Sequence, residues 1–158
     1  MSILCHMKNV ITIVLKLMRK FAMNYIFVVS AFGTAVSLYF SEFMDLPPCD
    51  LCWYQRIFFY PIFVIALVAL GLKDRGLKVY YYILTLSIIG LPIAVYHHLL
   101  KVTDLFPKQT PFCGTSGACS KIDWELIQGS GLTIPLLAAL GFLMIIVLCV
   151  VKVVGSEK

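Results

Sequence analysis

Charged residues are scarce in this sequence, and hydrophobic residues are abundant. Charged residues make up 13% of the 158 residues, and hydrophobic residues make up 61%. A typical soluble domain contains about 25% charged residues. The apolar residues also fall in blocks of about 20, the length of a helix that crosses roughly 30 Å of hydrocarbon. The composition therefore excludes an ordinary soluble domain and predicts an integral protein of a lipid bilayer.

A basic stripe interleaved with aromatic residues is also missing, although the net charge is +5. Such a stripe is typical of a nucleic-acid interface. The lysines and arginines lie at the ends of the apolar blocks instead, where they indicate membrane topology. Nucleic-acid binding is therefore not expected.

Acidic residues are absent from the first segment of the chain, which carries Lys8, Lys16, Arg19 and Lys20. Lys16 interrupts its apolar run, and no small-x-small cleavage motif precedes the next apolar block. A cleaved signal peptide is therefore not favoured. Residues 1–21 are predicted to be a basic cytoplasmic leader.

Four apolar blocks predict four transmembrane helices with short connections. The predicted spans cover residues 22–40, 52–72, 79–99 and 132–151, with outer loops at 41–51 and 100–131 and a tail at 153–158. The leader, the 73–78 turn, Lys152 and the tail together contain nine lysines and arginines, more than the outer loops contain. Positive residues favour the cytoplasmic side, so both termini are expected in the cytoplasm. The sequence predicts an all-α, four-helix transmembrane bundle, with a short interfacial helix over residues 120–128.

The six cysteines fall into two groups. Cys5 and Cys149 each lie alone: Cys149 is expected to fill the fourth span as a small buried hydrophobic residue, and Cys5 to be an incidental thiol. The other four lie in or beside the outer loops, in a compartment where exposed thiols rarely stay reduced. They form two pairs, Cys49 with Cys52 and Cys113 with Cys119.

The two outer pairs have three possible roles. Two structural disulfides would close rings too short to gain much loop-closure stabilisation. A four-sulfur zinc site is disfavoured because five residues separate Cys113 from Cys119, whereas zinc-binding cysteines are usually about two to four residues apart. A redox role is therefore favoured, and no metal site is expected.

The start of the second span places several chemically active side chains on one stripe. If the helix begins at Pro48 or Cys49, both sulfurs lie in its first turn, where unpaired amides and the helix dipole stabilise a thiolate. Cys52 and Arg56 are then four residues apart on one face. Three aromatic residues extend the stripe and could form a slot for a planar ligand or simply pack in the core: Phe59, Tyr60 and Phe63.

Two adjacent histidines, His97 and His98, end the third span on the same outer side. Each could bond a loop carbonyl, or could serve as the titratable proton donor that electron transfer to an acceptor requires.

The run Cys49-Asp50-Leu51-Cys52-Trp53-Tyr54-Gln55-Arg56-Ile57 opens the second of four spans, and a further outer cysteine pair precedes the fourth. This arrangement resembles the DsbB family of disulfide-generating membrane proteins, and most closely its compact BdbC branch. The resemblance covers nearly the whole chain after the leader. The five-residue gap in the second pair is much shorter than in the best-known members.

The resemblance implies an activity for the first pair in the bacterial cytoplasmic membrane. Cys49 and Cys52 would form a disulfide that a membrane quinone, ubiquinone or menaquinone, reoxidises. Cys52 would lie next to the quinone ring, and Arg56 would hold the quinone head group. One of His97 and His98 would lie near the quinone.

The resemblance also implies a role for the second pair. Cys113 and Cys119 would form a shuttle disulfide in the outer loop. A DsbA-like thioredoxin-fold oxidase would attack Cys113, and Cys119 would pass the electrons to Cys49. Two alternatives remain: an enzyme like vitamin K epoxide reductase, and a non-enzymatic membrane subunit with structural disulfides.

Overall fold

Four helices make up the computed structural model, which describes residues 2–44, 48–74, 76–103 and 133–156. They are α1 (Ser2–Glu42), α2 (Asp50–Gly71), α3 (Leu77–Val102) and α4 (Ile134–Ser156). All four are long and apolar enough to cross a membrane. The predicted all-α, four-helix transmembrane bundle is therefore confirmed. Cys113, Cys119 and the predicted interfacial helix at 120–128 lie outside the described residues.

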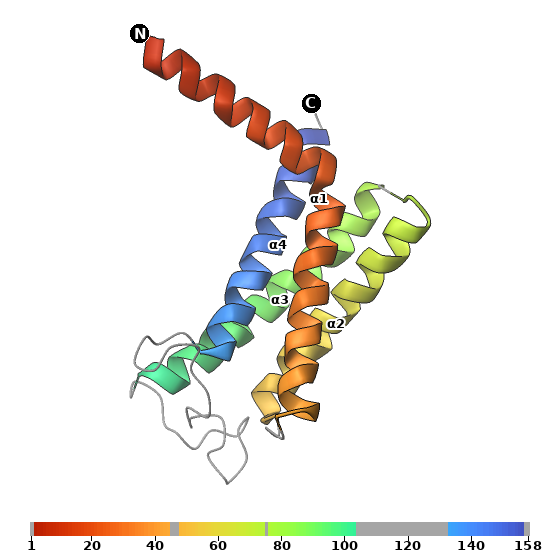
Figure 1. The fold of residues 1–158 in the computed structure, drawn as a ribbon, viewed down its shortest axis with the longest axis vertical. Helices are drawn as coiled ribbons and strands as arrows, with labels where there is room; N and C mark the ends of the chain where they lie inside the picture. The colour runs from red at the N-terminus through yellow and green to blue at the C-terminus, as the bar shows by residue number, and fades with distance from the viewer. Residues whose placement is uncertain (1, 45–47, 75, 104–132, 157–158) are drawn as a thin grey trace.

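The bundle is a ring in which each helix packs mainly on two neighbours. The packed pairs are α1 with α2, α2 with α3, α3 with α4, and α4 with α1. The short connection between α2 and α3 lies at the same end of the bundle as the end of α4 (Figure 1). The start of α2, the end of α3 and the start of α4 lie at the opposite end, which is called the site end below.

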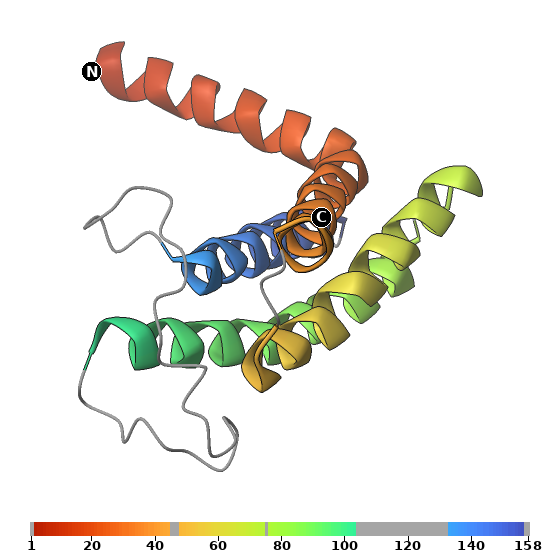
Figure 2. The same ribbon diagram turned by 60° about the horizontal axis from the view of Figure 1, so that its bottom comes forward.

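Helix α1 is longer than the predicted first span, because it includes most of the predicted leader in the same helix. No glycine or proline occurs before Gly33 to interrupt it. Its packing on the bundle begins at Met18, and Arg19 Nε donates a hydrogen bond to the carbonyl of Val151 on α4 at 3.2 Å. The preceding part of α1 projects away from the other helices (Figures 1 and 2).

Two phenylalanine rings in the centre of the bundle connect all four helices. Phe59 of α2 meets Phe142 of α4 edge to face, with ring centroids 4.8 Å apart. A Cβ atom on Gly33 of α1 would lie 2.5 Å from the Phe59 ring, and a Cβ atom on Gly90 of α3 would lie 2.5 Å from the Phe142 ring. The rings therefore occupy space that only glycine leaves open on the neighbouring helices, and small residues allow such close approach in membrane bundles.

Cys149 of α4 is fully buried in this core. Its predicted role as a buried apolar residue is confirmed.

A pair of glycine substitutions tests this packing. Gly90→Ala is expected to destabilise the bundle by about 1–3 kcal/mol, because the added methyl group overlaps the Phe142 ring. Gly71→Ala is the matched control, since nothing lies within 4 Å of its added Cβ atom, and alanine has the higher helix propensity. Unfolding of the purified protein in detergent would measure both. Equal stabilities of the two variants would contradict the close packing at Gly90.

Candidate redox site

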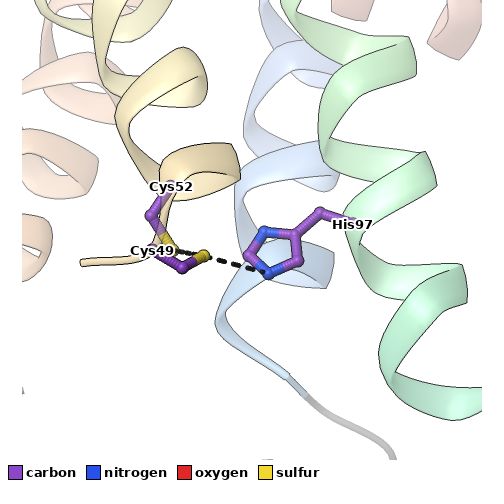
Figure 3. Close-up of side chains that lie close together, drawn as sticks. All are labelled: Cys49, Cys52 and His97. Carbon is purple, nitrogen blue, oxygen red and sulfur yellow. Dashed lines mark hydrogen bonds between the residues drawn. The ribbon is translucent and has the colours of Figure 1, made fainter. Parts of the chain in front are cut away.

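Cys49 lies just before the first residue of α2 and caps the helix. Its backbone is extended, with φ −71° and ψ 168°, and its carbonyl accepts a hydrogen bond from the Trp53 amide at 3.1 Å. Cys52 is the third residue of the helix, one turn along. The Cys49 thiol therefore reaches Cys52 and donates a hydrogen bond to its sulfur at 3.2 Å (Figure 3). The prediction that the sulfurs lie in the first turn is right for Cys52, whereas Cys49 is the preceding cap.

His97 of α3 brings an imidazole to this pair from a different helix. Its Nε2 atom lies 3.6 Å from the Cys49 sulfur (Figure 3). Its Nδ1 atom lies 2.9 Å from the Gln55 side-chain amide. His97 is 0% exposed and Gln55 is 7% exposed. Both nitrogens of this buried ring therefore contact side chains at the start of α2, one in the helix and one at its cap.

The Gln55 amide can bond His97 in two ways. An amide nitrogen that donates to Nδ1 leaves the ring proton on Nε2, facing Cys49, whereas an amide oxygen that accepts from Nδ1 leaves a lone pair on Nε2. The imidazole can therefore donate a hydrogen bond to the Cys49 sulfur or, as the other tautomer, present a lone pair to it.

His98 points to another partner. Its Nδ1 atom lies 2.9 Å from the Thr133 hydroxyl, and Thr133 directly precedes α4. The structure thus separates the two histidines that the sequence left equivalent: His97 joins the cysteines, and His98 joins α3 to the start of α4. A role for His98 near a quinone stays a prediction.

The surroundings of Cys49 raise the pKa of its thiol. Cys49 packs beside the buried side chains of Leu51 and Leu100. The hydrogen bond to Cys52, together with this burial, raises the pKa of the Cys49 thiol to about 12, and His97 opposes the increase. In the reduced pair, Cys49 is therefore the thiol that stays protonated, and Cys52 is the sulfur that accepts its hydrogen bond.

Arg56 lies one turn beyond Cys52 and faces α1. Its Nη2 atom donates to the Ser37 carbonyl at 3.0 Å and also to the Ser41 hydroxyl. Its guanidinium lies over the Trp53 ring, 5.3 Å from the ring centroid. Its Nε atom is buried and has no acceptor within the described part of the chain. One charged donor of Arg56 thus remains available for a further acceptor.

The aromatic stripe beyond Arg56 serves helix packing. Phe59 packs on Phe142, as described above, and Phe63 stacks on Phe27 of α1 with ring centroids 5.7 Å apart. The Tyr60 hydroxyl donates to the Ser37 hydroxyl at 3.3 Å. These contacts with α1 and α4 agree with the core-packing alternative, and a slot for a planar ligand beside these residues stays a prediction.

Sequence reasoning missed Gln55, Ser37 and Ser41. Gln55 was recognisable as a polar residue three positions after Cys52, and therefore on the same face of an apolar helix. Ser37 and Ser41 are four residues apart at the end of α1. Polar side chains inside membrane-spanning helices usually need a partner. This rule would have identified all three residues as candidates for contacts between helices.

Cys49, Cys52 and His97 also form a possible set of metal ligands. Their donor atoms all lie within 4.8 Å of one another. This set of two sulfurs and one nitrogen differs from the four-sulfur site that the cysteine spacing argued against.

The fold and this site define a multi-pass membrane protein with a redox-capable cysteine pair at one end of its bundle. The sequence profile of the family described as "Disulfide bond formation protein DsbB" matches residues 19–152. The chain belongs to the DsbB family, and the resemblance to this family and its compact branch is confirmed.

Several curated relatives carry names of the same kind. The SPbeta prophage-derived disulfide bond formation protein B of Bacillus subtilis (strain 168) is 40% identical over 135 residues, which cover 84% of this chain and 86% of the relative. The probable disulfide formation protein C 2 of Bacillus anthracis is 32% identical over 143 residues, covering 90% and 97%. A probable disulfide formation protein of Coxiella burnetii (strain CbuK_Q154) is 32% identical over 131 residues, covering 83% and 86%. No solved structure matches the chain significantly. The family identifies this chain as a disulfide-generating membrane oxidoreductase.

The high pKa of Cys49 predicts how its alkylation depends on pH. Only a thiolate reacts readily with iodoacetamide, so reduced Cys49 is expected to react slowly until the pH approaches about 12. Cys52→Ala removes the largest cause of the raised pKa, so the alkylation of Cys49 should shift to lower pH. Mass spectrometry of the full-length reduced protein would give the rate at each pH.

Cys149→Ala is the control for this measurement, because Cys149 is buried in the central core, and it should leave the Cys49 profile unchanged. Identical profiles in the wild type and in Cys52→Ala would show that the hydrogen bond between the two cysteines does not hold the Cys49 proton.

Proposed function

We propose that this protein reoxidises a soluble thioredoxin-fold thiol oxidase outside the cytoplasm and passes the electrons to a membrane quinone. The observation that carries the proposal is the contact of the Cys49–Cys52 pair with the buried imidazole of His97. A structural disulfide has no need of a buried proton-exchanging group, whereas a dithiol that is repeatedly oxidised and reduced must release and regain protons.

The distribution of charge supports placing the site end outside the cytoplasm. Lys73 and Lys78 flank the α2–α3 connection, and Lys152 lies near the end of α4. The α2–α3 connection and the end of α4 lie at the opposite end of the bundle from the start of α2 (Figure 1). Positive residues favour the cytoplasmic side of a membrane. The membrane would be the bacterial cytoplasmic membrane, because the relatives reported above come from bacteria.

The second cysteine pair would connect the partner to this site. A partner thiolate attacks the Cys113–Cys119 disulfide at Cys113, which releases Cys119 as a thiolate. Cys119 then attacks Cys49, breaks the Cys49–Cys52 bond and releases the Cys52 thiolate. Resolution of both mixed disulfides restores Cys113–Cys119 and leaves the partner oxidised. The exchanges move two electrons to the Cys49–Cys52 pair, and no sulfur is oxidised beyond a disulfide.

The groups around Cys49 and Cys52 favour this order of events. Cys49 is the cap and precedes the helix, whereas Cys52 lies within it, so Cys49 is the natural entry point for a loop thiolate. The hydrogen bond from Cys49 to Cys52 stabilises negative charge on Cys52. When Cys49 is released as a thiolate, His97 can supply its proton, and Gln55 holds the imidazole in place.

A bound quinone would be the oxidant, and it would take up two electrons and two protons. Such an oxidant is required, because a partner with a potential near −120 mV can be reoxidised only by a more oxidising acceptor. The buried Nε donor of Arg56, which has no partner among the residues that the structure describes, fits a quinone carbonyl oxygen. Ubiquinone and menaquinone both carry this acceptor. Arg56 would hold the head group one helical turn from Cys52, while Ser37 and Ser41 hold Arg56.

Trapping the partner tests this proposal. In Cys119→Ala the loop disulfide cannot form, so the Cys113 thiolate should attack the disulfide of the oxidised partner, a soluble thioredoxin-fold protein. Because Cys119 is not there to resolve it, the mixed disulfide at Cys113 should accumulate. Acid quenching of cells, followed by non-reducing electrophoresis and mass spectrometry, would identify the adduct. The matched control is Cys113→Ala, which should give no adduct with this partner. Absence of an adduct in Cys119→Ala would overturn the shuttle assignment.

A further inference from the structure

We infer that the reduced Cys49–Cys52 pair and His97 form a binding site for a thiophilic divalent cation such as Zn²⁺, and that metal binding and disulfide formation exclude each other. The three donors come from the cap of α2, the first turn of α2 and the end of α3 (Figure 3). Two helices packed on each other thus fix the set, and all its donor atoms lie within 4.8 Å of one another.

The distances between the donor atoms are close to those of a tetrahedral zinc site. Zn–S bonds of about 2.3 Å and Zn–N bonds of about 2.0–2.1 Å place two such sulfurs roughly 3.8 Å apart, and a sulfur and a nitrogen roughly 3.6 Å apart. Cys49 Sγ and His97 Nε2 are 3.6 Å apart, and the two sulfurs are 3.2 Å apart. The Cys52 sulfur and the His97 ring nitrogen lie within 4.8 Å of each other, so the Cys52 side chain would rotate to complete a tetrahedral set.

The donor types select the class of cation. Two thiolates and one imidazole suit Zn²⁺ and its heavier congener Cd²⁺, whereas Mg²⁺ and Ca²⁺ prefer oxygen ligands. Three protein ligands leave one tetrahedral position for water.

Gln55 provides the support that a metal-binding histidine needs. Such a histidine usually donates its other ring N–H to a carbonyl or carboxylate. Gln55 Nε2 lies 2.9 Å from His97 Nδ1, and a flip of the amide, which exchanges its nitrogen and oxygen, would let the oxygen accept that proton. The lone pair of Nε2 then faces Cys49. Leu51 and Leu100 surround this end of the site with apolar side chains, which strengthens charge interactions within it.

Binding changes protonation and leaves the oxidation state unchanged. Two thiols lose their protons to solvent, and two metal–sulfur bonds form. A disulfide offers no thiolate, so the site exists only in the reduced protein. If the proposed function holds, a bound cation keeps Cys49 and Cys52 reduced and stops turnover.

Cobalt spectroscopy of the full-length protein in lipid nanodiscs tests the site. The protein carries Cys113→Ser and Cys119→Ser, so that the loop thiols bind nothing, and it is reduced with a phosphine. Added Co²⁺ should bind at about one ion per chain with thiolate-to-cobalt charge-transfer and tetrahedral visible bands, and Zn²⁺ should displace it. Oxidation of the same sample to the disulfide should abolish binding.

The adjacent histidines give a matched pair of variants. His97→Ala should weaken Co²⁺ binding by about 10-fold or more, because one ligand is lost. His98→Ala should leave the affinity unchanged, because His98 bonds Thr133 instead. No binding by the reduced protein, equal binding by the disulfide form, or equal affinities of the two histidine variants would each overturn the site.

Failure of this inference is distinguishable from failure of the proposed function. Metal-free protein that oxidises its partner while the reduced form binds no Co²⁺ would contradict the metal site alone. Protein that binds Co²⁺ through His97 but oxidises no partner would contradict the proposed function alone.

Discussion

A buried imidazole ring needs hydrogen-bond partners for both of its nitrogens, and this requirement organises the site end of the bundle. His97 is fully buried on α3, and leaving either nitrogen unpaired there would be costly. Gln55 contacts one nitrogen and Cys49 contacts the other; Gln55 lies in the second turn of α2, and Cys49 is its cap. The contact therefore fixes the cap of one helix against the last turns of the other, and places a proton-exchanging group at the sulfur that would receive the incoming thiolate.

The rest of the bundle keeps these two helix ends in register. Phe59 and Phe142 fill the space above Gly33 and Gly90, so the middle of α2 cannot slide along α1 or α4 without a clash. Nearer the site, Arg56 bonds Ser37 and Ser41 and thereby joins α2 to the end of α1. The charged group that would bind a quinone and the sulfur that would reduce it are thus carried by the same well-packed helix.

Much of this arrangement could be predicted from local sequence. The apolar blocks predicted four spanning helices, and the proline before Cys49 indicated where α2 begins. Features set by tertiary contacts could not be predicted. His97 and His98 are adjacent, so they point about 100° apart on the helix, and only packing of α3 on α2 and α4 decides which one meets the cysteines. The aromatic residues after Arg56 form a stripe at helical spacing, but the sequence does not say that α1 and α4 cover it. The basic residues before Ala22 predict a leader, but they do not tell whether that leader continues the helix of the first span, because lysine and arginine are compatible with a helix.

The most direct test of the account is an anaerobic single turnover of the reduced Cys49–Cys52 pair in lipid nanodiscs that contain menaquinone or ubiquinone. The protein carries Cys113→Ser and Cys119→Ser, so that the first pair is the only redox-active pair left to react. We predict formation of the Cys49–Cys52 disulfide with loss of an equal amount of quinone. The reaction should slow in Arg56→Met, which removes the charged donor proposed to hold the quinone. A dithiol that stays reduced in the presence of quinone, or that is oxidised equally fast without Arg56, would contradict the account.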